Sequence, residues 1–178
     1  MSRKIKKSVS ILLALVMLFG VFAAAPFTVH AEGEYTTSDG KGEYALIPDE
    51  DDPDMYVLHL ISGEFTGTSF QITNNNGGIS TWTDDKIDDP SKIKKVQATE
   101  DVKFTGSCDF MFNQSFSNCK SMDFSLVDTT NADSMKGMFR KCGALETLDI
   151  SNFNTEHVKN MSIMFEGDRQ LSSLDLSK

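Results

Sequence analysis

Three cysteines and three histidines are the residues of this chain that could support nucleophilic chemistry. A reactive thiolate needs a neighbouring base and an electropositive setting. His59 or His157 would therefore have to lie beside one of the thiols. Cys119 and Cys142 each follow a Met-Phe element, where a small apolar side chain is suited to fill a core. We expect buried, unpaired, structural cysteines and no enzyme activity, because an odd number of cysteines without paired spacing does not build a disulfide framework.

Carboxylates and methionines could bind metal ions, but their spacing favours simpler explanations. The acidic run 49–54 carries alternating carboxylates, which are ligands of hard cations, yet it lacks the glycine and the distant glutamate of a twelve-residue calcium loop. A solvated linker is the favoured interpretation. Four methionines recur at helical spacing and face phenylalanines, which indicates a core rather than a soft-metal site. They are Met135, Met138, Met161 and Met164. We expect no cofactor and no metal.

An acidic ladder is the third candidate for chemistry. Asp123, Asp149 and Asp175 recur 26 residues apart, each inside a segment of the type Leu-Asp-Leu-Ser. If these segments are stacked parallel strands, the carboxylates lie about 4.8 Å apart and repel one another. A basic patch or a cation from a partner would relieve that repulsion. The alternative is that solvent and salt screen the charges, which then serve solubility.

The elements that must position these residues are repeats. A phenylalanine closes a Met-Phe element at 112, 139 and 165, and five residues earlier stand Ser107, Ser134 and Asn160, which are typical helix N-caps. Each repeat is therefore predicted to be a short strand, a turn and a helix of about two turns. A fixed period of this length is typical of a solenoid whose repeats are stable only when stacked. The predicted fold is an α/β solenoid, leucine-rich-repeat-like, with a small N-terminal β cap.

The N-terminus has the features of an export signal. Basic residues precede an apolar run from Val9 to Phe22, and Val29-His30-Ala31 suits a signal peptidase. We expect cleavage near Ala31; an uncleaved membrane anchor is the alternative, although the run is shorter than a spanning helix needs. The leader carries four basic and no acidic residues, so the formal net charge of −9 becomes −13 in the mature chain. That charge argues against nucleic-acid partners and against binding to anionic membranes.

The mature chain is predicted to form one domain with three parts. Strand-like alternation begins at Tyr56, a turn is expected at Ser62-Gly63, and a second strand is expected from Phe65 to Ile72. Trp82 is expected to pack over the end of the solenoid, with stacking on a sugar ring as the alternative. The predicted segments are a signal peptide at 1–31, an acidic flexible lead-in at 32–54, the β cap region at 55–97 and the repeats at 98–178.

The repeat resembles that of BspA-type leucine-rich-repeat surface proteins. Residues 148–167 read LDISNFNTEHVKNMSIMFEG, and the family pattern is approximately L-D-L-S-x-F-D-T-S-x-V-x-x-M-x-x-M-F-x-x-C-x-x-L. Cys142 and Leu145 match its last two positions after Phe139, whereas Asp168 replaces the cysteine in the next copy. The resemblance covers roughly residues 82–178. It implies a secreted or wall-associated bacterial protein used in adhesion or protein–protein contact, and a larger array of which this chain is a fragment.

Taken together, these features favour a secreted or cell-surface module that binds a protein or a host or cell-surface ligand through its repeat surface. The mature chain is not expected to insert into a membrane. The alternative is a targeting or carbohydrate-binding module of a larger secreted hydrolase.

Overall fold

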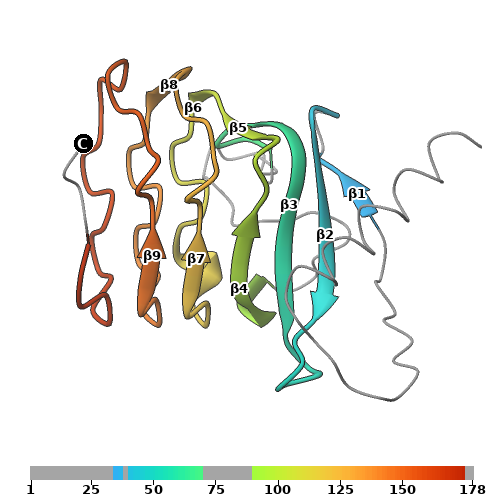
Figure 1. Cartoon of the computed structure of the whole chain (residues 1–178). Helices are drawn as coiled ribbons and strands as arrows, with labels where there is room; N and C mark the ends of the chain where they lie inside the picture. The colour runs from blue at the N-terminus through green and yellow to red at the C-terminus, as the bar shows by residue number, and fades with distance from the viewer. Residues whose placement is uncertain (1–33, 38–39, 70–89, 175–178) are drawn as a thin grey trace, which may run out of the picture. The chain divides into compact units, whose positions relative to one another are not determined.

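The computed structural model describes residues 34–37, 40–69 and 90–174 (Figure 1). The expected signal peptide, Trp82 and Asp175 lie outside these residues. The strands are β1 (Glu34–Thr36), β2 (Gly42–Pro48), β3 (Tyr56–Phe65), β4 (Ile93–Ala98), β5 (Val102–Phe104), β6 (Gly106–Ser107), β7 (Ser121–Asp123), β8 (Ala132–Ser134) and β9 (Thr147–Asp149). The two 3-10 helices are η1 (Pro90–Lys92) and η2 (Gln114–Phe116).

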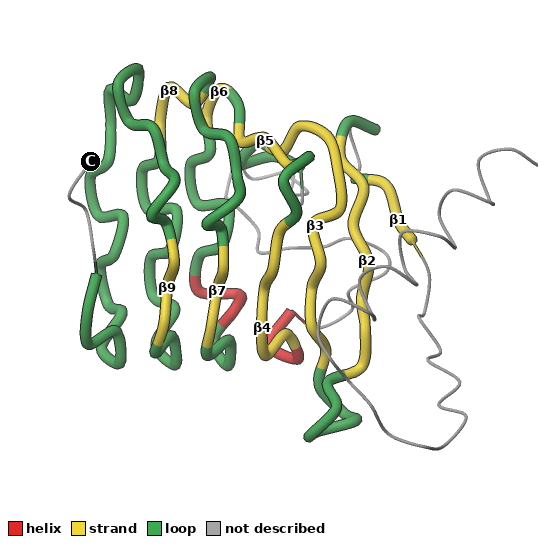
Figure 2. The backbone as a smooth tube through the Cα atoms, in the orientation of Figure 1, coloured by secondary structure: helices red, strands yellow, loops and turns green. Residues whose placement is uncertain are grey.

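The strands form a mixed sheet and a small second sheet. In the larger sheet the order is β1-β2-β3-β4-β7-β9, and β5 pairs with β3. β1, β2 and β3 run antiparallel, whereas β3, β4, β7 and β9 run parallel. β6 and β8 form the second sheet, also in parallel. Figure 2 shows the chain from β4 onward as successive coils, each with a short strand and long turns.

The prediction of one helix per repeat is wrong. The described residues contain no α-helix, only the two 3-10 turns η1 and η2. One reason is backbone conformation: Phe110, Gly137 and Ile163, which occupy the same place in successive repeats, have φ values of 58°, 59° and 54°. A residue in the left-handed region breaks a right-handed helix at that point. The fold is therefore a stack of strands and turns, and the leucine-rich-repeat-like α/β class is excluded.

Hydrogen bonds between coils replace those that a helix would make within itself. In a helix the N–H of Phe139 would bond to the carbonyl of Met135; here it donates to the carbonyl of Met164 at 3.0 Å. One coil earlier, the N–H of Phe112 donates to Met138 at 2.8 Å. The periodic Met-Phe element thus serves as a rung of an inter-coil ladder. The spacing of the apolar residues suggested a helix because an α-helix and this coil bury the same side chains.

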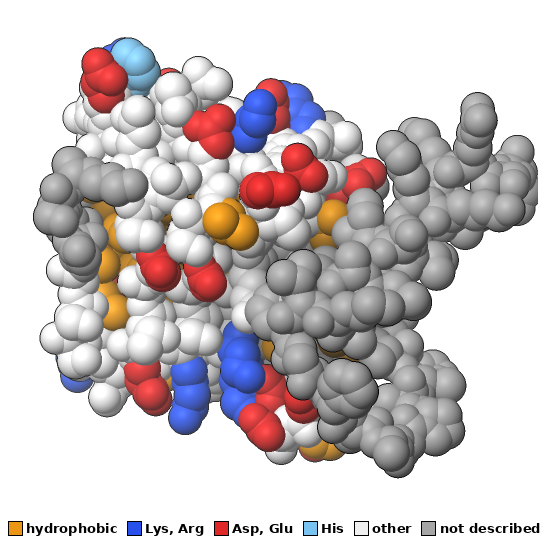
Figure 3. Space-filling model, viewed as in Figure 1, with side chains coloured by type: hydrophobic (Ala, Val, Ile, Leu, Met, Phe, Trp, Pro, Cys, Tyr) orange, Lys and Arg blue, Asp and Glu red, His pale blue; other side chains and the backbone are white. Residues whose placement is uncertain are grey.

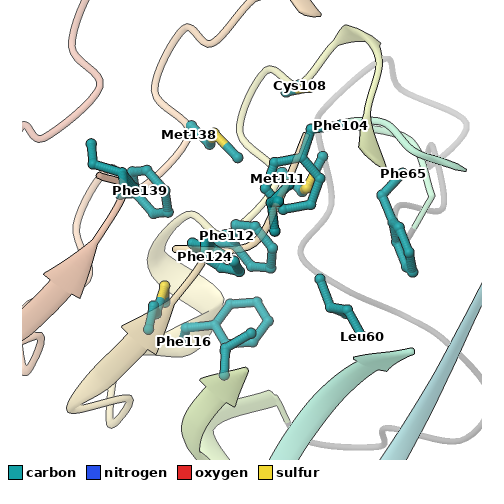
Figure 4. Close-up of a cluster of buried hydrophobic side chains, with 14 of the residues drawn as sticks. Leu60, Phe65, Phe104, Cys108, Met111, Phe112, Phe116, Phe124, Met138 and Phe139 are labelled. Atoms are coloured by element: carbon teal, nitrogen blue, oxygen red, sulfur yellow. The ribbon is translucent and has the colours of Figure 1, made fainter. Parts of the chain in front are cut away.

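The core is a stack of aromatic and sulfur-containing side chains (Figure 4). The rings of Phe112 and Phe139 lie 6.0 Å apart and within 7° of parallel, and Phe139 and Phe165 lie 5.8 Å apart and within 6°. The ring of Phe124, which directly follows β7, packs against the rings of Phe112 and Phe139. Met135, Met138 and Met164 are buried as expected of core methionines, whereas the side chain of Met161 is 38% exposed.

The N-terminal part differs from expectation in two places. Two strands, β1 and β2, occupy the stretch 32–54 that we expected to be a flexible lead-in, because Tyr44 and Leu46 supply a buried face that the acidic composition concealed. β3 continues through Ser62-Gly63 instead of turning there. Gly63 has φ of 97°, and a Cβ on it would lie 2.1 Å from the carbonyl oxygen of Lys41, so the strand passes the preceding one closely at this point.

The left-handed position predicts an unusual stabilising change. Ile163 is β-branched, 40% exposed and held at φ 54°. Ile163→Gly should stabilise the protein by about 0.5–1 kcal/mol, since relief of about 1–2 kcal/mol of strain exceeds the entropy cost of glycine. Thermal unfolding with Ser162→Gly as the control measures this effect. The reverse change, Gly137→Ala, should destabilise, because its Cβ would lie 2.4 Å from the Phe110 ring. Loss of stability in Ile163→Gly would show that the residue is not strained.

Candidate interaction surface

Two of the three predicted acidic residues, Asp123 and Asp149, lie on the outward side of the parallel part of the sheet. Register places Gln97 of β4 opposite Asp123 of β7, and Asp123 opposite Asp149 of β9. Both aspartates are exposed. Val96 and Met122, which pair with each other one position earlier in β4 and β7, are buried. Asp175 lies outside the described residues. Figure 3 shows two neighbouring acidic side chains in the middle of this face. The structure thus brings Asp123 and Asp149 together, as adjacent members of one row.

Each aspartate also has a local structural task that the sequence analysis missed. Asp123 Oδ1 accepts the backbone N–H of Ser125 at 3.0 Å and its hydroxyl at 2.7 Å. Asp149 Oδ1 accepts the N–H of Ser151 at 2.9 Å. An aspartate that bonds to the backbone two residues ahead closes a turn at the end of its strand. The recurring Asp-x-Ser spacing was the signal that could have revealed this.

The carboxylate of Asp149 is charged at neutral pH. The hydroxyl of Ser151 and then its backbone N–H lower the pKa of Asp149 below its ordinary value. Because only one oxygen of each carboxylate is engaged in the turn, the second is available to a partner. Lys120 and Glu146 approach to 3.6 Å at the neighbouring end of the strands, but both side chains are more than half exposed, so the pair contributes little energy. Leu126, three residues after the end of β7, is a large apolar side chain that is 54% exposed.

The residues capable of nucleophilic chemistry are not arranged for it. Cys108, Cys119 and Cys142 are all buried and free. Burial raises the pKa of the Cys108 and Cys119 thiols to about 12, and Cys142 donates its thiol proton to the carbonyl of Phe112 at 2.8 Å. These thiols therefore stay protonated and act as core residues.

The two histidines of the described residues lie in different environments. His59 is buried in β3, and burial lowers its pKa to about 4, so it is neutral under most conditions. His157 is exposed. Among the described residues no group of three or more histidine, cysteine or acidic side chains is placed to hold a metal ion. Within the same residues, no helix is both long and apolar enough to cross a membrane.

Asp168 is an acidic group of the repeats that is partly buried. It stands where the preceding coil has Cys142, and its Oδ1 accepts the N–H of that residue at 2.8 Å. Its Oδ2 is buried and has no hydrogen-bond partner in the part of the chain that the structure describes. Burial raises the pKa of Asp168 from 3.8 to about 6, and the hydrogen bond from Cys142 only partly opposes this rise.

This carboxyl predicts a pH-dependent stability of the last described coil. Its pKa is higher in the folded than in the unfolded chain, so the folded chain binds more protons between about pH 4 and 6 and stability falls as pH rises through that window. We expect Asp168→Asn to stabilise the protein by about 1 kcal/mol above pH 6, a value already reduced because the residue is half exposed. The gain should vanish below about pH 4. Denaturant unfolding of both proteins across pH tests this; a gain independent of pH would contradict it.

Comparisons with known proteins bear on the repeats. Residues 106–178 match a family model described as "Mycoplasma protein of unknown function, DUF285". Neither the curated proteins nor the solved structures contain a significant match. The matched segment begins at β6 and includes β7, β8 and β9, so it coincides with the stacked coils and with the acidic row. The stacked half of the chain is thus similar to a family whose described function is unknown.

Proposed function

We propose that the chain is a secreted or cell-surface interaction module that binds a protein partner through the outward face of its parallel strands. The observation that carries this proposal is the register of Asp123 with Asp149 on an exposed sheet face. Stacked like charges cost energy, and a basic surface on a partner would offset that cost. The resemblance of the repeat to BspA-type surface proteins supports a role in adhesion, and the signal-like leader supports export.

We propose a non-catalytic role, because the described thiols lie in the core. The thiols are buried with raised pKa values, and His157 is exposed. The acidic face also agrees with the charge of the whole chain, whose formal net charge is −9. An acidic surface of this kind steers basic partners toward it, and such association weakens as salt rises. The partner class we propose is therefore a basic protein surface on another cell or in its surroundings.

The test compares two double variants. Asp123→Asn with Asp149→Asn removes two charges from the face, and Glu100→Gln with Asp133→Asn removes two exposed charges elsewhere. Binding of each protein to an array of purified extracellular proteins and to intact cells is measured at low and high salt. We expect the first double variant to lose about 10-fold in affinity at low salt and to show a flatter salt dependence, because two charges of about 1 kcal/mol or less each are removed. Equal loss in both variants would assign the effect to net charge alone and contradict the proposal.

A further inference from the structure

A groove at the corner of two coils is a second surface that the acidic row does not include. Residues 128–130, in the connection from β7 to β8, form one wall, and residues 152–156, which follow β9, form the other. Its volume is about 600 Å³, within the range of small-molecule sites. The ring of Phe153, only 5% exposed, lies among the lining residues and packs against Phe104 and Phe124 in the core.

The two walls are fixed to one another by a buried hydroxyl. Thr129, 1% exposed, accepts the backbone N–H of Asn154 at 2.7 Å and donates to the carbonyl of the same residue at 3.0 Å. This pair of bonds joins the coils at the base of the groove. A site whose walls are held in this way is preorganised, so a ligand does not bear the entropy cost of ordering them.

Hydrogen bonds to the backbone determine which side-chain atoms of the groove residues are already engaged. Asn154 Oδ1 accepts the N–H of Glu156 at 2.9 Å, so its Nδ2, a donor, is free. Asn152 Nδ2 donates to the carbonyl of Val127 at 3.3 Å, which leaves its Oδ1 as an acceptor. Asp128 Oδ1 accepts the N–H of Thr130 at 2.9 Å, and the Thr130 hydroxyl also donates to this carboxylate, which retains further acceptor capacity. The residues that line the groove therefore offer an amide donor, from Asn154, and acceptors, from Asn152 and Asp128.

We propose that this groove binds a sugar unit through its hydroxyl groups. A hydroxyl both donates and accepts, so neighbouring hydroxyls of one sugar can bond to the Asn154 amide and to the carboxylate or amide acceptors around it. A basic side chain has only donors, so it could bond to the acceptors of the groove but not to the Asn154 Nδ2 group, which is also a donor. The backbone of Lys103 pairs with that of Asp128 in the neighbouring coil, and the lysine charge lowers the pKa of the Asp128 carboxyl by less than the hydrogen bonds from Thr130 do. The ligand that fits is neutral and rich in hydroxyls. The inference is independent of the acidic row, so either can fail alone.

The chain itself offers a matched variant for the test. Asp128 occupies the place of Asn154 one coil earlier and makes the same turn with a carboxylate. Asn154→Asp should therefore keep the turn and replace only the amide donor by an acceptor. Gln170→Glu, at an exposed site on a later part of the chain, adds the same charge as a control. Glu156→Gln is the second variant, because it keeps the backbone N–H that holds the turn.

The measurement is a titration of the isotope-labelled protein with methyl glycosides of glucose, galactose, mannose and N-acetylglucosamine, followed by backbone amide chemical shifts. We expect at least one glycoside to shift the amides of 128–130 and 152–156. Asn154→Asp should weaken that glycoside about 10-fold, since the site then lacks its donor, and Gln170→Glu should leave it unchanged. Glu156→Gln should weaken it by a smaller factor, and Asp123→Asn should have no effect.

Three outcomes would overturn the proposal. The first is the absence of groove shifts with every glycoside. The second is equal binding by the parent and Asn154→Asp, provided that their spectra show the same fold. The third is a groove response to a lysine-rich peptide that Asn154→Asp strengthens, which would assign the groove to a basic peptide instead.

Discussion

We expect Phe139→Ala to lower the free energy of unfolding by about 3–5 kcal/mol, the largest effect of any single change considered for this protein. Phe139 is fully buried, and its ring contacts those of Phe112, Phe124 and Phe165. Truncation removes the middle ring of the column and leaves a cavity between two coils. Because these coils are held together by packing and by the backbone ladder, the cavity cannot close without breaking rungs such as the bond from Phe139 to Met164.

The matched variant is Phe165→Ala. Phe165 belongs to the same column and stacks on Phe139 at 5.8 Å, but it is only partly buried. We expect it to cost about half as much as Phe139→Ala, and more than Lys159→Ala, whose exposed side chain should matter by less than about 0.5 kcal/mol. Denaturant unfolding of the three variants gives the comparison. If Phe165→Ala proved as costly as Phe139→Ala, the last coil would have to bury its phenylalanine more deeply than the structure indicates.

The repeat could be predicted from the sequence because stacking imposes a fixed period. The residues that recur, such as Asp123 with Asp149 and Phe139 with Phe165, do meet across neighbouring coils. The burial of side chains at a regular interval depends on the repeat length. It does not depend on how the backbone between two such side chains is folded. The periodic signal therefore placed residues in register while it left the local conformation undetermined.

The local conformation was missed because two structures share the Met-x-x-Met-Phe pattern. A helix and a turn-rich coil both bury Met135, Met138 and Phe139. The deciding feature is the left-handed residue two positions before the recurring phenylalanine, which is glycine at 137 but phenylalanine at 110 and isoleucine at 163. Only the glycine carries a recognisable signal. The residues that suggested N-caps bond differently: Asn160 Oδ1 accepts the N–H of Ser162, and the Ser134 hydroxyl donates to Asp109 of the preceding coil.

The candidate sites were predictable to different degrees. The acidic row follows from the repeat period, since one aspartate per repeat must form a row when strands stack in parallel. The corner groove could not be found in this way, because its walls differ: Asp128 and Asn154 occupy equivalent places but have different side chains. Its donor and acceptor pattern depends on which amide atom the backbone engages, and only the three-dimensional structure determines that.

The second large effect is expected at Asp49, where β2 ends. Its side chain is 1% exposed, with Lys94 Nζ 2.9 Å from Oδ1 and Lys95 Nζ 3.1 Å from Oδ2. The N–H of Asp51 also donates to Oδ1 at 3.1 Å. Both lysines belong to β4, so the carboxylate ties the β2–β3 connection to the first parallel strand of the stack. These two ammonium groups take the place that a bound cation would need, which weighs against the calcium-loop alternative for residues 49–54.

Asp49→Asn should destabilise the protein by about 1–3 kcal/mol, because a buried amide satisfies only one of the two lysines and leaves the other without its counter-ion. Asp51→Asn, on an exposed side chain of the same loop, is the control. Burial alone would raise the pKa of Asp49, but hydrogen bonds from Lys94, Lys95 and Asp51 lower it below 3.8. The folded pKa is thus below the unfolded one, so the stabilisation is complete above the unfolded value and is lost as pH falls through the folded value. The difference between parent and Asp49→Asn should therefore shrink in acid. The difference for Asp168→Asn should also shrink in acid, but it has the opposite sign, because that variant is the more stable protein at neutral pH. A difference that stays constant to low pH would show that the effect of Asp49 comes from packing and not from its charge.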